Sequence, residues 1–186
     1  VRMSRHVTAV LPPSARQMRA VVIREPGGPE VLEVRDVPAP EPPFGHVRVR
    51  VRLAGVNRAD LLQREGRYPP PAGASEILGL ECSGVLTEVG HHVRGWSVGD
   101  RVMALLPGGG YAEEAVVDAG SAMRVPDRLT DDEAAALPEV FLTAFLNLFL
   151  LARARQAESV LIHGGGSGVG TAGITLCRLS GVRVVV

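Results

Sequence analysis

The sequence contains no lysine, and all 20 of its Lys or Arg residues are arginine. Mechanisms that need a lysine Schiff base or a lysine nucleophile are therefore excluded for this chain. The arginines are balanced by 20 acidic residues, and the formal net charge of zero provides no general attraction to nucleic acid or acidic lipid. We accordingly expect neither nucleic acid nor a membrane among its partners.

Cysteine is also scarce. Cys82 and Cys177 stand far apart and outside any CxxC motif, so they indicate neither a disulfide framework nor a zinc cluster. The longest apolar run, residues 141–152, is too short to cross a bilayer and predicts a buried helix. With 46% hydrophobic and 22% charged residues among 186, the composition is that of a globular protein. We therefore expect a soluble, cytoplasmic protein with a packed core.

The first part of the chain has the pattern of short β-strands. Residues 46–53 alternate apolar residues with arginine, which places Arg48, Arg50 and Arg52 on one face of a strand. Because the net charge is zero, we interpret these arginines as a solvated outer face and not as a nucleic-acid stripe. Further strands are predicted at residues 18–24, 30–37, 82–89, 100–106 and 112–117. Short strands at this spacing are typical of a β-barrel or sandwich.

After about residue 130 the pattern changes to alternating helices and strands. A capping box at residues 130–133 predicts a helix that ends near Pro138, and a second, apolar helix is expected over residues 139–153. A buried strand at 159–163, a glycine-rich turn, a helix at 171–180 and a strand at 182–186 then form a βαβ unit. One such unit cannot cover both faces of a parallel sheet, so we expect the chain to be the front portion of a longer protein.

These patterns divide the chain into three segments. Residues 1–17 carry three arginines, no acid and no apolar signal core, which predicts a disordered leader, with a transit peptide as the alternative. Residues 18–138 are predicted to form an all-β domain. Residues 139–186 are predicted to form a linking helix and the start of an α/β domain with a doubly wound parallel sheet. The predicted fold class is thus all-β plus α/β.

The turn over residues 164–170 has the context of a dinucleotide site, with a strand before it and a helix after it. Glycines there let the backbone approach a pyrophosphate, and the N-terminus of the helix stabilises its charge. At the spacing of GxGxxG the residues are Gly165, Ser167 and Gly170, so serine replaces the middle glycine. Its hydroxyl can still donate to a phosphate oxygen. A structural turn without a ligand is the alternative interpretation.

Motifs spread over residues 18–186 resemble those of the medium-chain dehydrogenase/reductase superfamily. They are Gly27-Gly-Pro-Glu-Val-Leu32, Gly55-Val-Asn-Arg-Ala-Asp60, Ile77-Leu-Gly-Leu-Glu-Cys-Ser-Gly84, Val98-Gly-Asp-Arg-Val102, Leu106-Pro-Gly-Gly-Gly-Tyr-Ala112 and the loop at 163–170. Within that superfamily the chain is similar to the zinc-independent quinone oxidoreductases, which include zeta-crystallin and the p53-inducible quinone reductases. The resemblance implies a GroES-like β-barrel domain joined to a Rossmann domain, and a homodimer.

The resemblance also implies a site. Zinc-dependent relatives place a cysteine where Asn57 stands and a histidine where Leu80 stands; neither residue here is a normal zinc ligand, so we predict no metal site. Asn57 and Asp60 are the implied catalytic residues, with local capping of a helix over 58–65 as the alternative. The residues implied to contact the cofactor are Tyr68, Thr143, Gly165, Ser167, Gly168, Val169 and Gly170. For Tyr68 the alternative is a packed loop aromatic, and for Thr143 a hydroxyl bonded to the preceding turn.

Without a metal or lysine, the chemistry is expected to come from the cofactor, as hydride transfer from NADPH to a small quinone-like molecule. NADPH is implied by the subfamily alone and NADH stays an alternative, because the discriminating residues lie beyond Val186. Two other functions stay open. One is an enoyl reductase that acts on an α,β-unsaturated thioester or ketone. The other is a non-catalytic, crystallin-like protein that binds NADPH.

Overall fold

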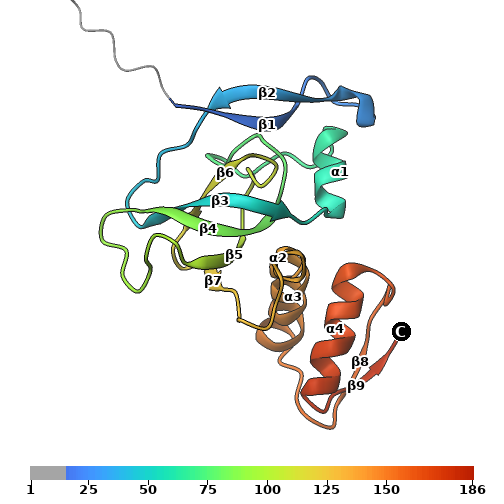
Figure 1. Cartoon of the computed structure of the whole chain (residues 1–186). Helices are drawn as coiled ribbons and strands as arrows, with labels where there is room; N and C mark the ends of the chain where they lie inside the picture. Colours follow the sequence, from blue (N-terminus) through green and yellow to red (C-terminus); the bar gives the residue numbers. More distant parts are fainter. Residues whose placement is uncertain (1–15) are drawn as a thin grey trace, which may run out of the picture.

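The computed structural model describes residues 16–186 (Figure 1). Its larger part is built around one antiparallel sheet in the order β6-β3-β4-β5-β7. The strands are β3 (His46–Ala54), β4 (Glu81–Val89), β5 (Arg101–Leu105), β6 (Glu114–Asp118) and β7 (Ala122–Arg124). A hairpin of β1 (Gln17–Ile23) and β2 (Leu32–Pro38) lies on one side of this curled sheet and is joined to it by a bridge between Ala20 and Ala112. The predicted all-β fold of this part is confirmed as a curled antiparallel sheet.

The core of this domain follows from the alternation in β3. Val47 and Val49 are fully buried because they lie on the face of β3 that points into the hydrophobic core. They pack in one cluster with Cys82 and Leu86 of β4. Burial raises the pKa of the Cys82 thiol to about 12, so this cysteine packs as a small hydrophobe and not as a reactive thiolate.

The opposite face of β3 differs from the prediction at one residue. Arg50 and Arg52 are exposed, but the Arg48 side chain is only 14% exposed and forms ion pairs with Glu88 and Glu114. Since the neighbouring strands β4 and β6 supply these two carboxylates, the prediction of a fully solvated face was wrong at Arg48.

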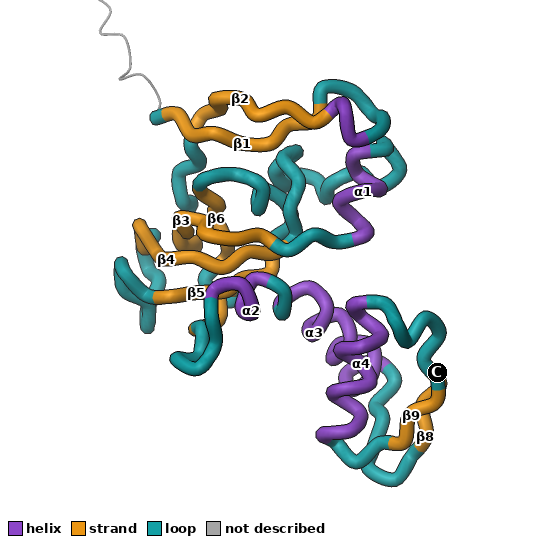
Figure 2. The backbone as a smooth tube through the Cα atoms, turned by 45° about the vertical axis from the view of Figure 1, so that its right-hand side comes forward, coloured by secondary structure: helices purple, strands orange, loops and turns teal. Residues whose placement is uncertain are grey.

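The smaller part follows the β-domain. It comprises α3 (Pro138–Phe145), a π-helical segment (Leu146–Leu151), β8 (Ser159–Leu161), α4 (Gly168–Leu179) and β9 (Arg183–Val185). The short helix α2 (Asp131–Ala135), which precedes α3, packs instead on β3, β4 and β5. The parallel pairing of β8 with β9, with α4 between them in sequence, confirms the predicted βαβ unit. Figure 2 shows α3 beside α4, and α3 also contacts β4 and β5, so this helix connects the two parts.

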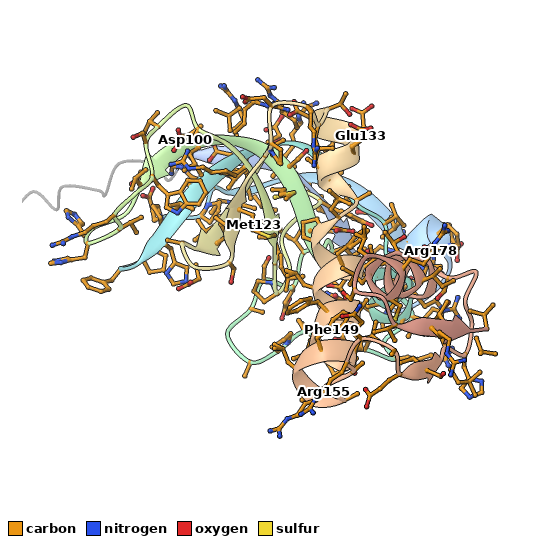
Figure 3. All side chains as sticks on the ribbon, turned by 90° about the horizontal axis from the view of Figure 1, so that it is seen from below. Asp100, Met123, Glu133, Phe149, Arg155 and Arg178 are labelled. Carbon is orange, nitrogen blue, oxygen red and sulfur yellow. The ribbon has the colours of Figure 1, made fainter. Side chains whose placement is uncertain are left out.

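Two predicted helices differ from the structure near their boundaries. The apolar helix expected over 139–153 begins at Pro138, a residue suited to the first helical position, and turns π-helical after Phe145. There the side-chain amide of Asn147 donates to the Thr143 carbonyl at 2.8 Å. Figure 3 labels Phe149 within this π-helical segment and Arg155 after its end. α4 begins three residues before the predicted position 171, because Ser167 already caps it.

The strand predictions also needed correction near turns. Residues Pro29–Val31 form a short 3-10 turn, so β2 starts at Leu32 instead of residue 30. β6 covers Glu114–Asp118 instead of 112–117, and the three-residue strand β7 was not predicted. All three errors lie at strand ends or in a very short strand, where too few residues are present for an alternation of apolar and polar residues to be recognised.

The predicted leader, residues 1–17, lies largely outside the described residues. Of this segment the structure describes Arg16 and Gln17. β1 begins at Gln17, and Arg16 forms an ion pair with Glu114 of β6. Both residues therefore belong to the β-domain, ahead of its predicted start at Met18. Within residues 16–186, none of the helices is both long enough and apolar enough to cross a membrane.

Candidate functional site

The glycine-rich turn connects the carboxyl end of β8 to α4. Ser167 is the N-cap of α4, and its Oγ accepts a hydrogen bond from the Gly170 N–H at 3.1 Å. Gly168 and Val169 occupy the first two positions of α4, where an N–H group has no carbonyl partner inside the helix, and both are exposed. Such N–H groups carry the positive end of the helix dipole. This turn therefore fits the pyrophosphate of a dinucleotide.

Two glycines of the turn are required by close packing. A Cβ at Gly170 would lie 2.4 Å from the Gly164 carbonyl oxygen and 2.7 Å from the Gly165 Cα. A Cβ at Gly165 would lie 2.5 Å from the Val186 Cγ1. By contrast, no atom lies within 4 Å of a Cβ built at Gly166. Gly170 thus lets α4 pack on the turn, and Gly165 leaves room for Val186 after β9, the close packing that glycines provide in a dinucleotide-binding turn.

A cavity of about 360 Å³ adjoins this turn and is shared by both parts of the molecule. The β-domain contributes Val56, α3 contributes Val140 and Phe141, and α4 contributes Gly168 and Thr171. A molecule in this cavity would contact both parts, beside the start of α4.

Asp60 lies near Val56 in sequence but is tied into a buried polar cluster. Its carboxylate is 2% exposed and accepts three hydrogen bonds. The donors are the Asn57 N–H at 2.7 Å, the Gly79 N–H at 3.1 Å and the Tyr111 hydroxyl at 3.0 Å. Asn57 is the N-cap of α1 (Arg58–Arg64), so the geometry includes the capping arrangement given above as the alternative. The catalytic roles of Asn57 and Asp60 stay predictions.

Glu81, the first residue of β4, links Asn57 to α3. It is 2% exposed; its Oε1 accepts from Asn57 Nδ2 at 2.8 Å and its Oε2 accepts from the Glu139 N–H at 2.9 Å. Glu81, Tyr111 and Glu139 were not predicted as members of this cluster. The available signal was a carboxylate within an otherwise apolar run, since Glu81 stands between Leu80 and Cys82.

Glu139 is half-buried in the first turn of α3. Burial raises the pKa of its carboxyl, and the nearby carboxylates of Glu81 and Asp60 raise it further, while a hydrogen bond from Thr143 acts in the opposite direction. Burial, together with the Asp60 carboxylate, likewise raises the pKa of the Tyr111 hydroxyl. The structure thus brings Thr143 into contact with a carboxyl whose environment favours the protonated form.

Glu139→Gln should make the protein more stable at neutral pH. An acid with a raised pKa in the folded state binds its proton more tightly there than in the unfolded chain. Stability is therefore lost as pH rises from the ordinary value of 4.5 through the folded pKa. Glutamine cannot ionise, so the variant lacks this loss. Urea unfolding from about pH 4 to about pH 8 should show the variant gaining on the wild type as pH rises. Parallel pH profiles for the two proteins would contradict this explanation.

Tyr68 lies in a different place from the glycine-rich turn. It lines a cavity of about 690 Å³ with Pro26, Gln63 and Ile77, between the β1–β2 hairpin and the loop after α1. None of the residues that line this cavity lines the one beside α4. The structure therefore does not bring Tyr68 and Ser167 to one cavity, and the cofactor contact of Tyr68 stays a prediction.

Asn57 and Leu80, which stand where zinc-dependent relatives are expected to have their cysteine and histidine ligands, are not zinc ligands. Asn57 donates to Glu81, and Leu80 is buried in the domain. Across the part of the chain that the structure describes, no group of three or more His, Cys, Asp or Glu residues could hold a metal ion.

Comparison with known proteins agrees with this architecture. Residues 43–127 match the family described as the alcohol dehydrogenase GroES-like domain. The chain is 39% identical over 163 residues to the synaptic vesicle membrane protein VAT-1 homolog-like of Mus musculus, a match that covers 88% of this chain and 39% of that protein. The CurK enoyl reductase structure is 29% identical, with a TM-score of 0.82, over 91% of this chain and 53% of its own. The quinone oxidoreductase from Coxiella burnetii is 30% identical, with a TM-score of 0.79, over 91% of this chain and 56% of its own.

The chain therefore contains a GroES-like domain of the alcohol dehydrogenase type, followed by a βαβ unit that opens on a glycine-rich turn. The similarities support its placement in the medium-chain dehydrogenase/reductase superfamily. The chain spans about half the length of these solved structures.

Proposed function

We propose that this chain belongs to an NADPH-dependent, zinc-independent oxidoreductase that transfers hydride to a quinone. The observation that supports this most directly is the position of the glycine-rich turn. The start of α4 opens on a cavity that Val56 of the GroES-like domain also lines. A nucleotide held at the turn would lie next to an acceptor held by the other domain, which is the proximity that hydride transfer needs.

The residues divide into holding and orienting roles. Ser167, Gly168 and Val169 would hold the phosphates, and Gly165 and Gly170 keep the backbone close enough for this contact. The nicotinamide, when bound, supplies the hydride. Asn57 would orient the cofactor or the acceptor. A quinone that gains a hydride and one proton becomes a hydroquinone; because water can supply that proton, a quinone places little demand on the chain for acid catalysis.

Several properties of the whole protein are part of the same proposal. The similarity to a quinone oxidoreductase supports the acceptor class. We expect a cytoplasmic homodimer whose ligand is a small quinone-like molecule, with no nucleic-acid or membrane partner. NADPH is the proposed cofactor and NADH the alternative.

Enoyl reduction is the second candidate. The CurK enoyl reductase is as similar in structure as any relative described above. Reduction of an enone also needs a proton at carbon, and the half-buried Glu139 carboxyl, whose pKa is raised by burial, is a possible source. A non-catalytic NADPH-binding protein is the third outcome that the following experiment separates.

The proposal is tested by NADPH oxidation in the chelator-treated, full-length protein, with an ortho-quinone and an enoyl-CoA as competing acceptors and NADH in parallel. We expect NADPH-dependent quinone reduction that survives chelation. Ser167→Arg fills the phosphate position and removes the N-cap hydroxyl, so NADPH affinity should fall by at least about tenfold, or about 1.4 kcal/mol. Ser180→Arg, at the exposed opposite end of α4, is the matched control and should bind NADPH normally.

Each contrary result has a definite meaning. Full activity in Ser167→Arg would refute binding at the glycine-rich turn. Enoyl reduction without quinone reduction would move the protein to the second candidate. NADPH binding without turnover of either acceptor would favour the non-catalytic protein.

A further inference from the structure

We infer that Glu81 is a positioning residue that fixes the side-chain amide of Asn57 for hydride transfer, an inference that rests on the proposed function. Glu81 is buried at the start of β4, and each of its carboxylate oxygens accepts one hydrogen bond from a neutral N–H group. No ion pair among residues 16–186 involves Glu81, so neutralising a cation does not explain its burial. Its remaining contribution is directional hydrogen bonding.

The carboxylate determines how the Asn57 amide is turned. An ionised carboxylate only accepts hydrogen bonds, whereas the two ends of an amide differ, with donors on nitrogen and an acceptor on oxygen. The Asn57 Nδ2 therefore faces Glu81, at 2.8 Å from its Oε1. The Oδ1 faces the start of α1, where it accepts from the Asp60 N–H in the capping box, and its second lone pair is the acceptor site that Glu81 does not engage. Asn57 thus offers a defined acceptor to an N–H or O–H group of the cofactor or of the reduced acceptor.

The second carboxylate oxygen of Glu81 forms a hydrogen bond with α3, in the other part of the molecule. Pro138 and Glu139 are the first two residues of α3, where N–H groups have no partner within the helix. Glu81 Oε2 accepts from the Glu139 N–H at 2.9 Å and so attaches β4 to the helix that carries Thr143. One buried carboxylate therefore sets the position of Asn57 relative to α3.

The Glu81 carboxylate lies directly against the backbone of Gly55. A Cβ at residue 55 would lie 2.2 Å from its Oε1, so the carboxylate occupies space that only a glycine leaves open. Gly55 directly precedes Val56, which lines the cavity shared by both parts. The Glu81 carboxylate thus packs on the backbone segment that leads to this cavity.

The test is a double-mutant cycle in the full-length protein with NADPH and an ortho-quinone. In Glu81→Gln the side chain has one acceptor oxygen for two donors, so either Asn57 or Glu139 faces an N–H₂ group. We expect kcat to fall by at least about tenfold, with a change of less than about threefold in NADPH affinity. Glu30→Gln, a change of the same type at an exposed carboxylate, is the control and should keep the wild-type kcat.

The cycle is completed by Asn57→Ala and by the double variant. If Glu81 acts through Asn57, the double variant loses no more kcat than Asn57→Ala alone, even if each substitution lowers the melting temperature separately. Losses in kcat that multiply, or a wild-type kcat in Glu81→Gln, would overturn the inference. A wild-type protein that neither binds NADPH nor reduces any acceptor would refute the proposed function itself, and the inference would fall with it. That result is distinct from multiplied losses in an active enzyme.

Discussion

Asp60→Ala is expected to destabilise the GroES-like domain by about 3–5 kcal/mol, because it leaves several buried donors without an acceptor. The Asn57 N–H, the Gly79 N–H and the Tyr111 hydroxyl all donate to this one carboxylate. Gly79 and Tyr111 lie on segments far from α1 in sequence, so the loss loosens contacts between three parts of the domain. Urea unfolding, with the free energy extrapolated to water, measures the effect.

Two matched variants separate the contributions. Tyr111→Phe removes one donor together with its share of the hydrogen bond and should cost only about 1 kcal/mol. Asp60→Asn keeps the size of the side chain but offers one acceptor oxygen, so its cost should fall between the other two. An Asp60→Ala variant within about 1 kcal/mol of the wild type would contradict a structural role.

The same series tests the catalytic role that the resemblance implies for Asp60. A catalytic carboxylate whose hydrogen bonds matter little to the fold would give an Asp60→Asn variant of wild-type stability with little turnover. Because Asp60 accepts three hydrogen bonds, we expect instead that Asp60→Asn lowers the free energy of unfolding and that turnover falls as a consequence. Asn57→Ala, measured in parallel, shows how much turnover depends on the neighbouring amide.

The overall fold could be predicted because its main elements carry long, regular patterns. The alternation of β3 identifies its buried face, and the strand–glycine–helix order of residues 159–180 identifies the βαβ unit. The errors occur where side-chain contacts and not periodicity decide the outcome. Arg48 is buried by carboxylates from two other strands, and the amide of Asn147 bonds a carbonyl in the preceding turn. Neither contact is visible in the local sequence.

The candidate site was predictable only where it is local in sequence. Ser167 and its glycines form one continuous turn, so their spacing was sufficient. The polar cluster instead joins Glu81 at the start of β4, Tyr111 before β6 and Glu139 at the start of α3, and it exists only after the domain has folded. For Tyr68 the resemblance implied a cofactor contact, but this residue lines a cavity separate from the one beside α4.

Gly170→Ala is expected to raise the Kd for NADPH by at least about tenfold, or about 1.4 kcal/mol. Two effects oppose one another at this position. Alanine is the better helix former by about 1 kcal/mol, and Gly170 lies in the first turn of α4. The new Cβ, however, would stand 2.4 Å from the Gly164 carbonyl oxygen and 2.7 Å from the Gly165 Cα. Both are backbone atoms that cannot rotate away, and relief of such overpacking typically costs about 1–3 kcal/mol, so the collision outweighs the helix propensity.

Gly166→Ala is the control for this prediction, because it makes the same chemical change in the same turn. No atom lies within 4 Å of its Cβ, and its φ is not in the left-handed region. This variant should therefore keep both its stability and its NADPH affinity. Equal losses in both variants would mean that the turn tolerates no side chain at all, for example because the ligand itself covers Gly166. Equal tolerance would mean that the turn and α4 can separate without cost. Only a loss confined to Gly170→Ala shows that contact between α4 and the backbone of Gly164 and Gly165 holds the N–H groups of Gly168 and Val169 in place for a phosphate.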